Sequence, residues 1–99
     1  MEKLNPSHDL EAFKAAFARH RTATKTALLT AEEIGYERTD IAAVVERLKP
    51  RNFIKSMTSY NDHRQWQDVY IIEDRGKSIY LKFTDHILTE FILLSFKRK

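Results

Sequence analysis

The chain has 99 residues, with 17 Lys/Arg against 14 Asp/Glu and no cysteine. This length predicts one domain over residues 1–99, and the absence of thiols excludes a disulfide framework, a thiolate zinc site and a cysteine nucleophile. No apolar run is long enough for a signal peptide or a membrane span, so we expect a cytoplasmic protein. The basic excess lies in residues 51–99, which hold 9 Lys/Arg against 6 Asp/Glu, and is compatible with a polyanion or an acidic protein as partner.

The first predicted element after a lead-in of residues 1–6 is an amphipathic helix. Ser7 is a candidate N-cap, because its hydroxyl can accept a hydrogen bond from the first turn. Leu10, Phe13 and Phe17 follow at helical spacing and form an apolar stripe. We therefore expect a helix that buries these three side chains.

Two further helices are predicted before residue 50. One covers residues 27–34 and stops at Gly35, a residue type that favours the left-handed conformation after a helix. The next is capped by Thr39 and ended by Pro50. Its apolar stripe is formed by Ile41, Val44, Val45 and Leu48.

From residue 53 the pattern becomes typical of strands. Residues 53–60 and 67–73 are rich in aromatic and β-branched types and contain no Gly or Pro. Asn61–Asp62 lies between them, and these side chains can bond to their own backbone and so initiate a turn. The two runs therefore predict a pair of strands.

Two more strands are predicted at residues 77–84 and 87–97. Arg75–Gly76 precedes the first as a hairpin turn, and Asp85–His86 separates the two. Alternation directs one set of apolar side chains towards the helices: Ile79, Leu81, Phe83, Ile92, Leu94 and Phe96. Helices followed by strands predict an α+β fold, with N-terminal helices packed on a C-terminal antiparallel sheet.

The opposite face of the same strands is polar. It is predicted to carry Tyr80, Lys82, Ser95 and Lys97. Lys55 and Gln67 join this face if the register allows. Lysines bind phosphate as point charges, and a Tyr or Lys can transfer protons when its pKa lies near the working pH. Antiparallel sheets often carry polar residues on their solvent face, so this pattern alone leaves a phosphate site and an ordinary surface both open.

No cofactor site is predicted. The four histidines, His8, His20, His63 and His86, form no ligand-like cluster in the sequence. With only Gly35 and Gly76, the chain has no glycine-rich phosphate loop. We therefore expect no metal and no other cofactor.

A DNA-binding interpretation is the alternative. Residues 27–48 read as helix, glycine turn and helix, and the strands that follow make a winged helix-turn-helix regulator possible. The recognition helix of that unit, however, presents apolar Ile41, Val44 and Val45. Its cations are only Arg47 and Lys49. This composition is more typical of a buried helix.

One block of mixed polar and aromatic residues, 55–70, reads K-S-M-T-S-Y-N-D-H-R-Q-W-Q-D-V-Y. Shorter pieces accompany it: Met1-Glu2-Lys3, Ala27-Leu28-Leu29, Ala31, Glu33, Gly35, Tyr80-Leu81-Lys82 and Ser95-Phe96-Lys97. Together these residues resemble the MqsR family of bacterial toxins, over nearly the full length. The resemblance implies a RelE-like ribonuclease toxin fold and the toxin of a type II toxin–antitoxin system.

The resemblance also implies an active site without a metal. In the matching positions its residues are Lys55, Gln67, Tyr80 and Lys97. The implied reaction is attack of an RNA 2′-OH on its own phosphate, giving a 2′,3′-cyclic phosphate and a 5′-OH. Lys55 and Lys97 would stabilise charge, Tyr80 would transfer a proton and Gln67 would position the substrate.

The implied partners are mRNA, cut preferentially at GCU, and a cognate MqsA-like zinc-containing antitoxin. Weaker candidates for RNA binding are Tyr60, His63 and Lys82, which lie within or beside the matching blocks. The sequence departs from the family pattern mainly at residues 71–78 and 85–90. The sequence preference depends most on those loops if they contact bases.

Overall fold

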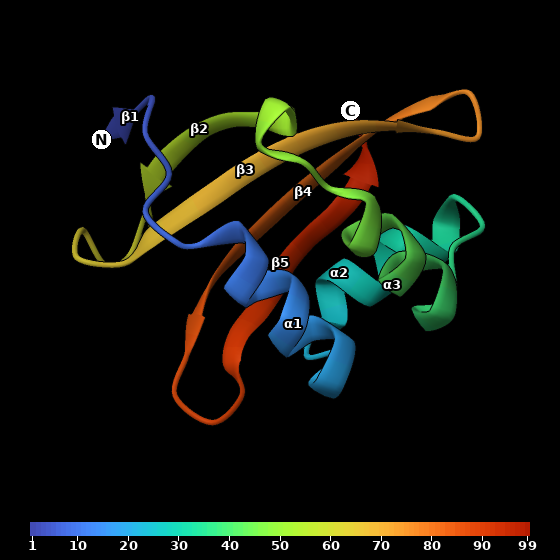
Figure 1. The fold of residues 1–99 in the computed structure, drawn as a ribbon, viewed down its shortest axis with the longest axis horizontal. Helices are drawn as coiled ribbons and strands as arrows, with labels where there is room; N and C mark the ends of the chain where they lie inside the picture. Colours follow the sequence, from blue (N-terminus) through green and yellow to red (C-terminus); the bar gives the residue numbers. More distant parts are fainter.

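The computed structural model describes all residues from 1 to 99, with three helices followed by most of an antiparallel sheet (Figure 1). The helices are α1 (Leu10–His20), α2 (Lys25–Glu33) and α3 (Arg38–Arg47). The strands are β1 (Glu2–Lys3), β2 (Phe53–Thr58), β3 (Trp66–Asp74), β4 (Lys77–His86) and β5 (Glu90–Arg98). They lie in the order β1-β2-β3-β4-β5, and each neighbouring pair is antiparallel. The predicted α+β class is confirmed. None of the helices combines the length and apolar character that crossing a membrane requires.

Two of the predicted helix caps are wrong by two residues. α1 is capped by Asp9, whose carboxylate accepts the Ala12 N–H at 3.0 Å. Ser7 instead belongs to a contact with the sheet, because its backbone N–H donates to Asp68. α3 begins after Glu37 rather than Thr39, and the Asp40 carboxylate accepts the Glu37 N–H in a capping box.

The glycine stop after α2 is confirmed. Gly35 has a φ of +85°, the left-handed region that residues with a Cβ avoid. The following Tyr36 N–H donates to the Ala31 carbonyl at 2.9 Å, which closes the helix end.

Of the two hairpin turns predicted between the last three strands, one is confirmed and one is wrong. Arg75–Gly76 forms the predicted turn, with φ values of 53° and 72°. The turn predicted at Asp85–His86 is wrong, because β4 continues through His86, which pairs with Glu90. His86 Nδ1 lies 3.2 Å from the Thr89 hydroxyl, so the imidazole helps to hold the turn at residues 87–89.

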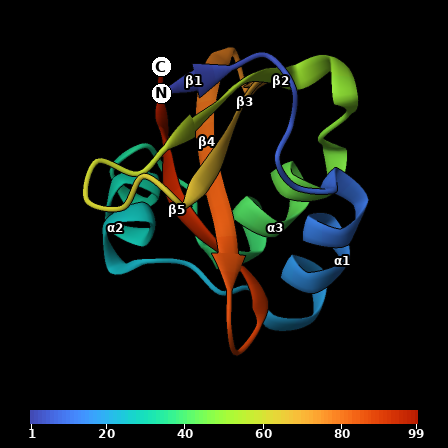
Figure 2. The ribbon, with the colours of Figure 1, turned by 90° about the vertical axis from the view of Figure 1, so that its left-hand side faces the viewer.

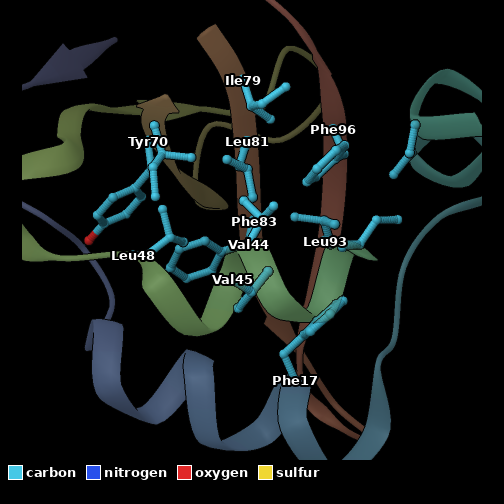
Figure 3. Close-up of a cluster of buried hydrophobic side chains, with 14 of the residues drawn as sticks. Phe17, Val44, Val45, Leu48, Tyr70, Ile79, Leu81, Phe83, Leu93 and Phe96 are labelled. Carbon is cyan, nitrogen blue, oxygen red and sulfur yellow. The ribbon is translucent and has the colours of Figure 1, made fainter. Parts of the chain in front are cut away.

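The core lies between the sheet and α1 and α3, which cover one side of it (Figure 2). Phe13 of α1 stacks on Phe83 of β4, with ring centroids 3.7 Å apart. The α3 stripe is buried as predicted: Ile41, Val44, Val45 and Leu48. Figure 3 shows Val44, Val45 and Leu48 directed towards Leu81 and Phe83. α2 runs beside β5, where the Thr30 hydroxyl donates to the Phe96 carbonyl at 2.7 Å.

The predicted inward residues of β5 are partly wrong. Ile92 and Leu94 are only half-buried, whereas Leu93 is completely buried. The cause is a β-bulge: Lys82 pairs with Ser95, but the next residue, Phe83, pairs with Leu93. One extra residue on β5 reverses its alternation, so that Leu93 joins Phe96 in the core.

The burial of α3 argues against the DNA-binding alternative. Ile41, Val44 and Val45 pack into the core cluster and are at most 2% exposed. A recognition helix needs an exposed face that can enter a DNA groove. α3 has its apolar face fixed against the sheet.

Leu81→Ala tests the assignment of the two sheet faces. Leu81 is completely buried, and truncation of such a side chain is expected to lower the free energy of unfolding by roughly 2–5 kcal/mol. Lys82, its neighbour on the other face, has two lysines nearby, so Lys82→Ala is expected to cost little. Urea denaturation of both variants measures the difference. Equal midpoints would mean that the faces are reversed.

Candidate active site

The strand register brings four of the predicted residues to one face of the sheet. Val69 of β3 lies opposite Lys55 of β2 and opposite Lys82 of β4. On the next pair of strands, Tyr80 lies opposite Lys97. Directly paired residues point to the same side of a sheet. Lys55, Tyr80, Lys82 and Lys97 therefore share the face turned away from α1 and α3, and we call these four residues the lysine face.

The lysine face carries more positive than negative charge. Partial burial lowers the pKa of Lys82, and the nearby charges of Lys97 and Lys55 lower it further. Lys97 Nζ lies 5.2 Å from the centroid of the Tyr80 ring, at cation–π distance. The only carboxylate paired with these lysines is that of Glu2, 2.7 Å from Lys55 Nζ. Three lysines with one carboxylate give this face a net positive charge, which favours the approach of an anion such as a phosphate group.

Gln67 lies at the margin of this face. It pairs with Met57, two residues along β3 from Val69, and therefore points to the same side as the lysines. Its side chain is largely buried, and its amide donates to the Gln65 side chain at 3.3 Å. Gln67 therefore has a fixed position, but it contacts none of the four residues of the lysine face through a hydrogen bond.

The loop between β2 and β3 carries two of the three weaker RNA-binding candidates, Tyr60 and His63. Its predicted turn is confirmed, because the Asp62 carboxylate accepts the Arg64 N–H at 2.9 Å. Tyr60 is 97% exposed, and His63 is also exposed. Both belong to a shallow hollow of about 510 Å³, lined by Met1, Met57, Thr58, Ser59, Tyr60 and His63. Met57 connects this hollow to the lysine face, because it points to the same side of β2 as Lys55.

The remaining histidines have structural surroundings. His8 Nε2 lies 2.9 Å from the Trp66 carbonyl oxygen, and its ring packs against Phe83 and Phe91. His20 is the last residue of α1. No group of three or more His, Asp or Glu side chains converges in the way that a metal site requires.

Comparison with known proteins identifies the family. A family model described as "motility quorum-sensing regulator, toxin of MqsA" matches residues 5–98. The chain is a member of the MqsR toxin family. The mRNA interferase toxin MqsR of Escherichia coli (strain K12) is 37% identical over 100 residues, which cover 100% of this chain and 100% of that protein.

One residue of the site was not predicted from the sequence. Glu2 lies in β1, which pairs with β2 through Glu2–Met57 and Lys3–Ser56. From sequence, residues 1–6 are predicted only as a lead-in, because a two-residue strand shows no alternation. The only signal was the match of Met1-Glu2-Lys3 to the MqsR family. This match indicates that the N-terminal segment belongs to the shared fold, but it assigns Glu2 no function.

Proposed function

We propose that this chain is an endoribonuclease of the mRNA interferase type, which cleaves mRNA at the lysine face and so inhibits translation. The observation that carries the proposal is the convergence of Lys55, Lys82, Lys97 and Tyr80 on one face, in a member of a toxin family. A cytoplasmic location agrees with such a substrate.

The proposed reaction needs no cofactor. The RNA 2′-OH loses its proton as its oxygen attacks the adjacent phosphorus, the bond from phosphorus to the 5′-oxygen breaks, and the leaving 5′-oxygen takes up a proton. The products are a 2′,3′-cyclic phosphate and a 5′-OH. Lys55 and Lys97 stabilise the charge on the phosphorane, and Tyr80 transfers a proton. Gln67 positions the substrate from its fixed place at the margin of the lysine face.

We assign the hollow beside the lysine face to a nucleobase. Its side chains supply thioether, aromatic, hydroxyl and imidazole groups but no carboxylate, Lys or Arg, and the Met1 ammonium is engaged with the Thr58 hydroxyl at 3.1 Å. Such a surface suits an uncharged planar group, and an exposed Tyr60 ring is available for stacking. With a phosphate bound to the lysines and a base bound to Tyr60 and His63, the protein would contact both the backbone and a base of its preferred sequence. Preference for GCU is the expectation from family resemblance.

The proposal is tested by incubating the pure protein with single-stranded RNA that contains GCU and control triplets. Cleavage with 2′,3′-cyclic phosphate ends, unchanged by EDTA, is the expected result. Tyr60→Ala is expected to alter the distribution of cut sites more than the total rate. Intact RNA under all conditions, or activity that EDTA abolishes, would contradict the proposed reaction.

The proposed protein partner is an MqsA-like, zinc-containing antitoxin. Family membership supports an antitoxin as partner, and the basic second half of the chain suits an acidic surface on it. Complementary charges accelerate encounter at low salt. We therefore expect the association rate to fall severalfold as salt is raised, as measured by stopped-flow or surface binding. A rate independent of salt would place the basic excess outside the interface.

A further inference from the structure

The N-terminal strand contributes a carboxylate to the lysine face. Glu2 pairs with Met57 on β2, and Lys55 lies two residues from Met57 on the same side of that strand. The Glu2 carboxylate reaches Lys55 Nζ at 2.7 Å. We propose that Glu2 is a positioning residue of the active site, which holds the Lys55 ammonium where it contacts the scissile phosphate. This inference rests on the proposed function and adds β1 to the catalytic unit.

β1 is held against the sheet by contacts on both sides of Glu2. The Thr58 N–H donates to the Met1 carbonyl at 2.9 Å. Lys3 Nζ lies 4.3 Å from the centroid of the Trp66 ring. These contacts, together with the β1–β2 ladder, restrict the position of the Glu2 backbone. The carboxylate is therefore presented from an anchored strand rather than from a free terminus.

A buried carboxylate secures the chain that follows β1. Asp68 is completely buried, and it accepts the backbone N–H groups of Ser7 and His8 at 3.0 and 2.9 Å. The Ser7 hydroxyl also lies 2.6 Å from the Ser56 hydroxyl. Hydrogen bonds to a charged acceptor are among the stronger ones in proteins. The segment that leads from β1 to α1 is thus tied to the middle of the sheet.

The Glu2 carboxylate distinguishes Lys55 from the other lysines. The hydrogen bond from Lys55 to Glu2 is the main cause that raises the pKa of Lys55. Lys82 has no such partner, and burial together with the charges of Lys97 and Lys55 lowers its pKa. A lysine ammonium has three donors, so Lys55 can bind Glu2 and a phosphate oxygen at the same time. Glu2 therefore favours the charged form of Lys55 and restrains its ammonium, which lies near the like charge of Lys82.

Glu2→Gln tests this role. It keeps the size of the side chain and removes its charge. The expected result is a fall in kcat of roughly tenfold, since small displacements of a catalytic group are costly. The melting temperature is expected to stay nearly unchanged, because exposed ion pairs contribute little to stability. The alkaline limb of the pH–rate profile should move to lower pH, because Lys55 without its carboxylate loses its proton more readily. Glu2→Asp is expected to restore part of the rate.

A matched control and a double variant complete the experiment. Glu11→Gln removes an exposed carboxylate that pairs with Lys14 on α1, on the other side of the sheet, and is expected to leave the rate unchanged. Adding Glu2→Gln to Lys55→Ala is expected to cause no further loss, because Glu2 acts through Lys55. A fully active or faster Glu2→Gln enzyme, beside an impaired Lys55→Ala, would overturn this inference alone. An unimpaired Lys55→Ala would overturn the proposed site as well.

Discussion

A single 2′-deoxy nucleotide on the 5′ side of the cut is expected to abolish cleavage at that position. In the proposed reaction the 2′-oxygen is the nucleophile, and the protein supplies only charge and proton transfer around the phosphate. Removal of that oxygen leaves the lysine face able to bind the phosphate but with no attacking group. A synthetic RNA with one preferred site, with and without the deoxy substitution, measures the effect by gel electrophoresis.

The matched control places the deoxy nucleotide one position further in the 3′ direction, where the sugar carries the leaving 5′-oxygen. That substrate is expected to be cut at nearly the normal rate. Competition between the two oligonucleotides and unmodified RNA reports whether the deoxy substrate still binds. Continued cleavage at the substituted position would show that water or a protein group is the nucleophile, and the proposed reaction would be wrong.

The sequence pattern was most informative where several residues repeat one period. The stripe Ile41, Val44, Val45 and Leu48 predicted the buried side of α3, and all four side chains are buried. The alternation of β4 likewise separated Leu81 in the core from Tyr80 and Lys82 on the other face. A long run averages over the preference of any one residue. A single local contact therefore rarely changes which face of the helix or strand is buried.

Single local signals were less reliable, because tertiary contacts compete for the same groups. Ser7 is a good helix cap by type, yet its hydroxyl lies 2.6 Å from the Ser56 hydroxyl of the sheet, and Asp9 caps α1 instead. The bulge that places Leu93 rather than Leu94 in the core adds one residue to β5. Alternation along one strand contains no information about such an insertion, because the partner strand defines it.

The candidate site likewise combines residues that follow from alternation along one strand with residues that come together only through strand pairing. Tyr80 and Lys82 alternate on one strand, and Lys97 joins them once β4 and β5 are paired. The closeness of Lys55 depends on β3, whose Val69 lies between Lys55 and Lys82 in the register. Glu2 reaches the site through a two-residue strand that pairs with a segment more than fifty positions away. Only the folded sheet shows that contact.

Tyr80→Phe is expected to slow RNA cleavage by at least roughly tenfold, with little change in the melting temperature. General acid–base groups contribute about 100- to 10,000-fold to rate, so a tenfold loss is the smallest effect that agrees with proton transfer by Tyr80. The Tyr80 side chain is half-buried on the lysine face rather than in the core, so the loss of its hydroxyl leaves no core cavity. Single-turnover cleavage of a short RNA measures the rate.

Tyr70→Phe is the matched control for Tyr80→Phe. Tyr70 lies on the neighbouring strand with its ring in the core, where burial raises the pKa of its hydroxyl to about 12. A phenol held neutral on the helix side of the sheet cannot reach RNA on the lysine face. Its removal is therefore expected to leave the rate unchanged. Equal losses in the two variants would mean that hydroxyl removal acts through the fold.

Lys97→Ala tests the proposed role of Lys97 in stabilising charge on the phosphorane. Loss of one positive group from the site is expected to reduce turnover by roughly 100-fold or more, as for the loss of a preorganised donor to a developing oxyanion. Lys49→Ala removes the same charge from an exposed position just after α3, on the helix side of the sheet, and is expected to be nearly as active as the wild type. A similar small loss of turnover in both variants would mean that Lys97 contributes only a general electrostatic attraction for RNA. Full activity in both Tyr80→Phe and Lys97→Ala would show that the lysine face is not the site of cleavage.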